Sequence, residues 1–460
     1  ATPQYLFPNR MICGFGDTHP NYLNTTPVVR MIENAQVNGK EEQERYFTAL
    51  LKCLDPDAGK AAAKKNVRVS INSFFDDKPL TLKPDIRAGK IEDYVSPLFY
   101  APNVSWLVQR NGMHPRNSLM ISSLNASEGN HMHANGISME LYGKGYVLGP
   151  DAGIGLYLYS GLDYAEYYSQ FPSHNTVCVD GISSYPVMKS NHSFDLLSCF
   201  PASSAAAAAK DKFPSVTYSD VYFREPESRA DQTRMMSIVT TGPETGYYVD
   251  IFRSRKERGG DKMHDYFYHN LGQTLTLTGT NGTDLNLQPT EELAFAGAHL
   301  YAYSYIYDKK SATTDKDIKA TFTITMPDKD DISMNLWMKG ETDREVFTAL
   351  SPMTEGLSRT PGMPYNIKEQ PTLTFVARQK GEAWNRPFVA VYEPSTVKEP
   401  SCIASVSFPE VKSKTENSAT SICVVQKDGR IDYILSSDTP TDICTSGKMS
   451  AQATYALWGN

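Results

Sequence analysis

The first ninety residues contain the helical spacing of apolar side chains. A helix is predicted from Thr26 to Asn38, because Pro27 suits a first turn and Gly39 ends helices. Its apolar face consists of Val28, Met31, Ile32 and Ala35. A second helix is predicted over residues 40–54, before Asp55-Pro56, with an apolar face of Tyr46, Ala49, Leu50, Cys53 and Leu54. Two helices joined by a short turn form an αα-hairpin, which needs further helices as neighbours to bury its apolar face.

From about residue 95 the apolar spacing changes to the two-residue period of β-strands. Strand-length blocks separated by glycine turns occupy residues 138–142, 247–251, 301–307, 321–325, 372–376 and 431–435. They predict a large antiparallel region built as a β-sandwich. The alternating tyrosines of residues 301–307 are expected to pack as one sheet face, with a sugar-stacking platform as the alternative.

The chain is therefore predicted to have an α+β multidomain fold, since 460 residues are too many for one ordinary domain. The expected division is a helical domain over residues 1–92, a central β-sandwich over residues 93–340 and a C-terminal β-sandwich or sheet domain over residues 341–460.

The charge balance limits the partners. With 45 basic and 52 acidic residues the net charge is −7, which argues against nucleic acid and anionic membranes as partners. An anionic polysaccharide remains compatible, because a few arginines in a groove suffice to bind it. No run of apolar residues is long enough to span a membrane. The seven scattered cysteines are expected to be buried thiols, with one or two disulfides as the alternative.

Candidate chemistry is concentrated between residues 130 and 180. His131 and His133 point to one face if the backbone is extended, and Asp151 and His174 follow in separate segments. Two imidazoles and a carboxylate form a ligand set that zinc accepts. The alternative is that these polar side chains are satisfied separately, with Asp151 shaping the turn after Pro150.

Three stretches resemble one known family. Residues 130–153, NHMHANGISMELYGKGYVLGPDAG, then HNTVCVDG from His174, and GYYVDIFRSRKERGGDKMHDYFYHNLG from Gly246, are similar to the core of the heparinase II/III-like polysaccharide lyases. That family includes heparin, heparan and alginate lyases. The resemblance implies an N-terminal α/α toroid of paired helices followed by antiparallel β-sandwich domains.

The resemblance also implies roles for individual residues. His131 becomes an active-site residue, and His133, Asp151 and His174 become ligands of one structural zinc ion. His192 is the alternative to His174 as the third zinc ligand, and the HNT motif favours His174. Tyr164 lies where the family carries a substrate-facing tyrosine. Arg110 and Arg116 are candidates for binding carboxylate or sulfate groups, while His264 and His269 are expected to be structural hydrogen-bonding residues.

The chain departs from the family pattern at two places. Asn135 replaces an aspartate beside the metal site and is kept as a substrate-binding candidate. The family's asparagine–histidine pair and catalytic tyrosine lie on toroid helices, for which this chain has little room, and the GFGDTHPNYLN segment from Gly14 resembles a part that follows them. The chain is thus expected to be the C-terminal portion of a longer lyase, with the N-terminal portion as a partner, and Tyr5 is the one candidate for the catalytic tyrosine.

The implied reaction is β-elimination, in which a base removes the C5 proton of a uronate and the O4 glycosidic oxygen departs. Alginate, ulvan-like polymers and lightly sulfated glycosaminoglycans are the substrate candidates. A periplasmic or secreted location is expected. The alternatives are a non-catalytic carbohydrate-binding scaffold and a uronyl C5-epimerase.

Overall fold

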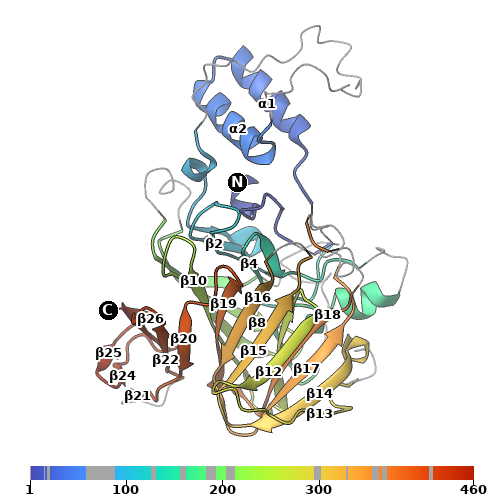
Figure 1. Ribbon diagram of the computed structural model, residues 1–460, viewed down its shortest axis with the longest axis vertical. Helices are drawn as coiled ribbons and strands as arrows, with labels where there is room; N and C mark the ends of the chain where they lie inside the picture. Colours follow the sequence, from blue (N-terminus) through green and yellow to red (C-terminus); the bar gives the residue numbers. More distant parts are fainter. Residues whose placement is uncertain are drawn as a thin grey trace.

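A computed structural model describes residues 2–14, 16–17, 21–57, 89–125, 131–155, 162–182, 193–203, 213–294, 302–327, 330–354, 362–364, 370–413 and 418–459. Figure 1 shows a helical hairpin at one end of the molecule, a stacked β-sandwich below it and a small β unit at the C-terminus. Among the described residues, no helix is both long and apolar enough to cross a bilayer.

The predicted helical hairpin is present as α1 (Thr25–Val37) and α2 (Glu41–Leu54). Helix α1 begins one residue before the predicted Thr26, because the Asn24 side chain accepts a hydrogen bond from the Thr26 backbone N–H and caps the helix. Buried residues of the hairpin pack on the N-terminal segment, with Ile32 and Leu50 beside Leu6. These are the two α-helices of the described ranges, so a toroid with further helix pairs stays a prediction.

A five-stranded antiparallel meander follows the hairpin. Its strands, in spatial order, are β1 (Leu98–Ala101), β2 (Trp106–Arg110), β3 (Met120–Leu124), β4 (Ser138–Gly143) and β5 (Tyr146–Gly149). Figure 1 places β2 and β4 between the hairpin and the sandwich. The described residues before β4 lie beside the N-terminal segment, because the backbone N–H of Asp17 donates to the His131 carbonyl at 3.0 Å.

The sandwich consists of an eight-stranded and a six-stranded antiparallel sheet. The first has the order β12 (Thr274–Gly279), β15 (Ile318–Ile324), β16 (Ile332–Met338), β19 (Ala383–Thr396), β10 (Gly246–Lys256), β9 (Ala230–Thr240), β8 (Val216–Glu225) and β7 (Asp195–Phe200). The second has the order β13 (Gln288–Pro289), β14 (Tyr307–Thr314), β17 (Arg344–Ser351), β18 (Thr372–Lys380), β11 (Met263–Asn270) and β6 (Val177–Val179).

Aromatic side chains join the two sheets. Tyr268 of β11 and Tyr392 of β19 have ring centroids 4.8 Å apart, and Tyr266 lies 5.4 Å from Phe388 in the same way. The outer face of the eight-stranded sheet is also apolar, because Val249 and Ile251 of β10 pack against the C-terminal unit. A strand buried on both faces has a nearly continuous apolar sequence, and the GYYVDIF run is interrupted only by Asp250, which pairs with Arg234.

The C-terminal unit has a four-stranded sheet, β20 (Ile403–Ser407), β22 (Thr420–Gln426), β23 (Ile431–Ser436) and β26 (Tyr455–Gly459), and a small sheet of β21 (Lys412–Ser413), β24 (Cys444–Ser446) and β25 (Met449–Ala451). The predicted boundary between residues 340 and 341 is wrong, because β17, β18 and β19 belong to the central sandwich. Their long-range pairing with earlier strands is invisible in local sequence patterns.

The strand predicted over residues 301–307 is a second correction. Residues Ala302–Tyr305 form a 3₁₀ helix, η8, and the strand β14 begins only at Tyr307. The Tyr303 hydroxyl donates to Asp265 at 2.7 Å and the Tyr305 hydroxyl to Glu166 at 2.7 Å, so these side chains do not share a sheet face. All seven cysteines lie in the described residues, where no disulfide joins them to one another, and four of them are buried.

Candidate metal and active site

The three predicted ligands come together although they lie on separate segments. His133 precedes β4, Asp151 follows β5, and His174 lies between the 3₁₀ turn η6 (Phe171–Ser173) and β6. One potential ligand atom from each residue lies within 4.8 Å of the other two. The His174 Nδ1 atom is 2.8 Å from Asp151 Oδ2, and the imidazole centroids of His133 and His174 are 5.4 Å apart.

This cluster suits a zinc ion in both donor type and protonation state. All three residues are buried. Burial lowers the pKa of His133 below its usual value, which keeps the imidazole neutral and able to coordinate a metal. Burial alone would raise the pKa of Asp151, but the charge and hydrogen bond of His174 lower it, so the carboxylate is ionised. Among the described residues, no hydrogen-bond partner reaches the buried Nε2 atom of His174.

Asp17 is the site residue that the sequence reasoning missed. Its Oδ1 atom lies 3.0 Å from His133 Nε2 and accepts a hydrogen bond of 2.5 Å from the Tyr164 hydroxyl. Its Oδ2 atom lies 2.8 Å from His131 Nδ1. Burial alone would raise the pKa of Asp17, but the hydrogen bonds of His133, Tyr164 and His131 lower it to about 2. One ionised carboxylate thus links a predicted ligand to both predicted active-site residues.

The contact with His133 gives Asp17 a second role. Because His133 Nε2 is directed to this carboxylate, Nδ1 is the atom that the imidazole can offer to a cation. A carboxylate behind a ligating histidine fixes the ring and raises its basicity. Asp17 therefore connects the candidate metal site with the candidate reaction site.

The segment that carries Asp17 is held by specific contacts. The buried Glu140 carboxylate accepts hydrogen bonds from the backbone N–H groups of Gly14, at 2.9 Å, and Asp151, at 3.3 Å. The Asp17 N–H donates to the His131 carbonyl at 3.0 Å. A side chain at Gly14 would stand 3.1 Å from Asp151 Cβ, so the backbone passes very close to the ligand segment.

Gly16 allows an even closer approach. It has a φ of +53°, and a Cβ atom there would lie 2.0 Å from the His131 carbonyl oxygen, which is backbone and not easily displaced. The two glycines of the GFGD motif are the sequence signal that could have identified Asp17, since glycine is needed where two backbone segments nearly touch.

We expect Gly16→Ala to lower the free energy of unfolding more than Gly39→Ala does. Both glycines have positive φ, but a Cβ atom at Gly39 would meet nothing within 4 Å. The backbone conformation alone costs about 1–3 kcal/mol at either position. Urea unfolding gives the free energy of unfolding of both variants, and the difference between their losses is the cost of the clash with the His131 carbonyl. Equal losses would contradict the close contact between Gly16 and His131.

His131 and Tyr164 lie at the solvent-facing side of the cluster. The His131 side chain is 70% exposed, whereas that of His133 is fully buried. Tyr164 begins the single π-helical turn η5 (Tyr164–Tyr168), and its ring centroid is 5.8 Å from that of His133. An ionised carboxylate thereby orients an imidazole and a phenol that a ligand from solvent can reach.

The other predicted site residues lie elsewhere or have different roles. Arg110 is fully buried, and its guanidinium donates to the carbonyls of Gln4 and Leu6, so it anchors the N-terminal segment and does not face a groove. Tyr5 packs on the Trp106 ring, with centroids 4.3 Å apart, and no described contact joins it to the site. The substrate-binding prediction for Arg110 is therefore wrong, and the position of Tyr5 does not support a catalytic role.

Arg116 and Asn135 are also placed differently from the prediction. The Arg116 guanidinium forms ion pairs with Glu399 at 2.9 Å and Asp330 at 3.4 Å, which tie the β2–β3 connection to the end of β19. These two carboxylates would compete with an anionic ligand for the Arg116 guanidinium. Asn135 is 1% exposed, so its side chain does not face solvent as a substrate-binding residue would.

His264 and His269 fit their predicted structural roles. The His264 ring lies 2.9 Å from Ser254 Oγ and 2.8 Å from Asp261 Oδ1, and the His269 ring lies 2.9 Å from both Thr374 Oγ1 and the Pro172 carbonyl. His192, the competing ligand, lies outside the described residues.

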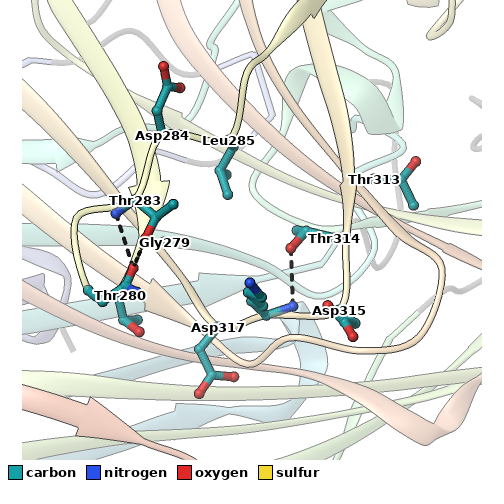
Figure 2. A pocket seen from close by; sticks show the side chains of 11 residues that line it. Gly279, Thr280, Thr283, Asp284, Leu285, Thr313, Thr314, Asp315 and Asp317 are labelled. Atoms are coloured by element: carbon teal, nitrogen blue, oxygen red, sulfur yellow. Dashed lines mark hydrogen bonds between the residues drawn. The ribbon is translucent and has the colours of Figure 1, made fainter.

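A separate polar cavity of about 610 Å³ lies between the turn after β12 and the turn between β14 and β15. Figure 2 shows hydroxyl and carboxylate side chains around it, including Thr280, Thr314, Asp315 and Asp317. None of the predicted site residues lines this cavity, so it is distinct from the histidine cluster.

Comparisons with known proteins match the helical N-terminal part of the chain and the β-rich part after it to two different family models. Residues 1–94 match the family model of the endo-acting ulvan lyase second domain, and residues 96–230 match that of the heparinase II/III-like C-terminal domain. An endo-acting ulvan lyase of Formosa agariphila is 29% identical, over 95% of this chain and 54% of that protein. This chain thus spans about half the length of that relative.

Solved structures of low sequence similarity also match. A heparinase III is 10% identical and is matched over 100% of this chain and 51% of its own, with a TM-score of 0.44. The heparan sulfate lyase HepC from Pedobacter heparinus is 12% identical, over 99% of this chain and 51% of its own, with a TM-score of 0.45.

Proposed function

We propose that this chain is part of a polysaccharide lyase acting on a uronate-containing polymer of the ulvan type, because residues 96–230 match the heparinase II/III-like C-terminal family model and an endo-acting ulvan lyase is 29% identical. The observation that carries the proposal is the Asp17 carboxylate, which joins His131 and Tyr164 beside a buried ligand set. The relative that is an endo-acting ulvan lyase favours ulvan among the uronate polymers.

The reaction is β-elimination, for which the side chains have suitable chemistry. Asp17 is ionised and faces His131 Nδ1, so the neutral imidazole carries its lone pair on Nε2. In this proposal, His131 accepts the C5 proton of the uronate through Nε2, and Asp17 stabilises the imidazolium that forms. Asp17 also holds the Tyr164 hydroxyl, whose proton is directed at this carboxylate in the free site. Tyr164 is the candidate for protonating the departing O4 oxygen, for which its O–H would turn from Asp17 to O4 and leave a tyrosinate that recovers its proton from solvent.

His133, Asp151 and His174 would hold one zinc ion in a structural role. The positive charge of the ion would fasten three separate chain segments together beneath the reaction site. Elimination requires no water nucleophile, so the zinc ion would not have to activate a water molecule. Its contribution would be to hold the segments that position His131 and Tyr164.

An absorbance assay tests the lyase proposal. The zinc-supplemented protein is mixed with ulvan, heparan sulfate or alginate, and the ultraviolet absorbance of the unsaturated uronate product is followed. We expect product with ulvan, and about 10²–10⁴-fold less with His131→Ala. His114→Ala is the matched control, because His114 lies in the β2–β3 connection, where its Nδ1 atom accepts from the backbone N–H groups of Arg116 and Asn117, and no described contact joins it to the candidate site.

Other outcomes of the assay select other functions. Binding of ulvan with no unsaturated product would indicate a carbohydrate-binding scaffold. Deuterium incorporation at C5 without chain cleavage would indicate an epimerase. Absence of product and of deuterium exchange with every uronate polymer would refute the proposed activity for this chain.

A further inference from the structure

Arg234 of β9 is a fully buried arginine that contacts two of the segments carrying the candidate zinc ligands. Its Nη1 atom donates to the Ile137 carbonyl at 2.6 Å and to the Asn175 carbonyl at 2.7 Å. Ile137 follows His133 by four residues, and Asn175 directly follows His174. One nitrogen atom therefore joins the His133 segment to the His174 segment.

Asp250 of β10 fixes the direction of this guanidinium. Its Oδ1 atom accepts from Arg234 Nε at 2.8 Å, and its Oδ2 atom accepts from Nη2 at 2.7 Å. The Tyr266 hydroxyl also donates to Oδ2, at 2.5 Å, and the Phe252 ring centroid lies 5.2 Å from the guanidinium carbon. With two nitrogens held by the carboxylate, the planar group must direct Nη1 at the two carbonyls.

Asn175 extends the connection to the third ligand segment. Its side-chain amide donates to the Met139 carbonyl of β4 at 2.9 Å and approaches the Gly149 carbonyl, two residues before Asp151, at 3.4 Å. Its Oδ1 atom accepts from the His269 N–H at 2.7 Å. The segments of His133, Asp151 and His174 are thus linked through backbone carbonyls and not only through the ligands themselves.

We propose that Arg234 is a positioning residue for the metal site, which fixes the spacing of the His133 and His174 segments so that the ligands converge before the cation binds. This inference rests on the proposed zinc site. It assigns to a buried ion pair of the sandwich core a function in metal affinity, in addition to its contribution to folding.

The test is Arg234→Lys, with zinc affinity measured by competition with a chromophoric chelator. Lysine keeps the charge beside Asp250, but its single nitrogen cannot hold the carboxylate and both carbonyls in one geometry. We expect the affinity for zinc to fall about 10–100-fold, as for other residues that support metal ligands. Amide hydrogen exchange of the zinc-free variant should increase in residues 131–137 and 173–176.

Arg378→Lys is the matched control. Arg378 forms a buried pair with Asp265 through contacts of 2.7 and 3.0 Å, and the Tyr303 hydroxyl donates to the same carboxylate, but this arginine lies on β18 and no described contact joins it to a ligand segment. We expect a similar loss of thermal stability and a change in zinc affinity below about 3-fold, since no support of the metal ligands is removed.

The result is decisive in each case. Unchanged zinc affinity in Arg234→Lys, or equal losses in both variants, would overturn the inference. If Arg234→Lys does not fold, Asp250→Asn compared with Asp265→Asn makes the same comparison, because each removes the carboxylate charge that orients its arginine. A wild-type protein that does not bind zinc would refute the proposed metal site itself, a result distinguishable from a failure of the Arg234 variants alone.

Discussion

Asp17→Asn is expected to lower the rate of unsaturated product formation about 10²–10⁴-fold at saturating zinc. Asparagine has the shape of aspartate but no charge, and its NH2 group would replace one of the two acceptor oxygens, so that either His131 or Tyr164 would face a donor in place of an acceptor. His131 would lose both its orientation and the charge that stabilises an imidazolium. The measurement is kcat/KM on ulvan, together with zinc stoichiometry to show that the metal site is filled.

Asp261→Asn is the control for this prediction. Asp261 also pairs with a histidine, since its Oδ1 atom lies 2.8 Å from His264 Nε2, and hydrogen bonding lowers its pKa as it does for Asp17. No described contact joins it to the proposed reaction site, so its variant should keep the wild-type rate. Equal rates for the two variants would show that the proposed reaction does not depend on the charge of Asp17.

His174→Ala is expected to weaken zinc binding about 10²–10⁴-fold, because a structural zinc ion gains about 10–16 kcal/mol from its whole ligand set and this variant removes one ligand. The wild-type protein should bind one zinc ion and melt at a higher temperature with zinc than after chelation, since a ligand that binds only the folded state stabilises it. Zinc affinity is measured by chelator competition, and thermal stability by calorimetry with and without zinc.

His264→Ala serves as the comparison for His174→Ala. Both imidazoles are fully buried and lie 2.8 Å from an aspartate, but His264 belongs to no described ligand cluster. The two variants should therefore lose similar stability in the zinc-free state, whereas His264→Ala alone should retain zinc binding. Retention of zinc by His174→Ala would remove this residue from the ligand set.

Local sequence patterns predicted the features that depend on local structure. The helical hairpin, the strands around residues 138–142 and 247–251, and the segments of the three candidate ligands follow from periodicity and short motifs. The convergence of His133, Asp151 and His174 was supplied by the family resemblance, because spacing alone left separate hydrogen bonding as an alternative.

The failures share a physical cause, which is contact between segments far apart in the chain. Asp17 contacts His131 although 114 residues separate them in the chain. The contact depends on glycines that let two backbone segments come close, and such glycines leave no periodic pattern of apolar residues in the sequence. Arg110 has the sequence context of a surface cation, but the N-terminal segment covers it and supplies carbonyl acceptors. The tyrosines of residues 302–305 alternate as in a strand, yet their hydroxyls bind carboxylates on different elements, Asp265 and Glu166.

The origin of Asp17 bears on how the two matched parts of this chain can be recombined with those of other proteins. This carboxylate comes from the part of the chain that matches one family model, whereas His131, His133 and Tyr164 come from the part that matches another. A chimaera joined between residues 94 and 96 would have to preserve the GFGD turn and its acceptor at the His131 carbonyl. The two parts would also have to keep their shared hydrophobic cluster, in which Phe7 and Met11 pack with Met120 and Tyr142, so neither can be exchanged without its partner.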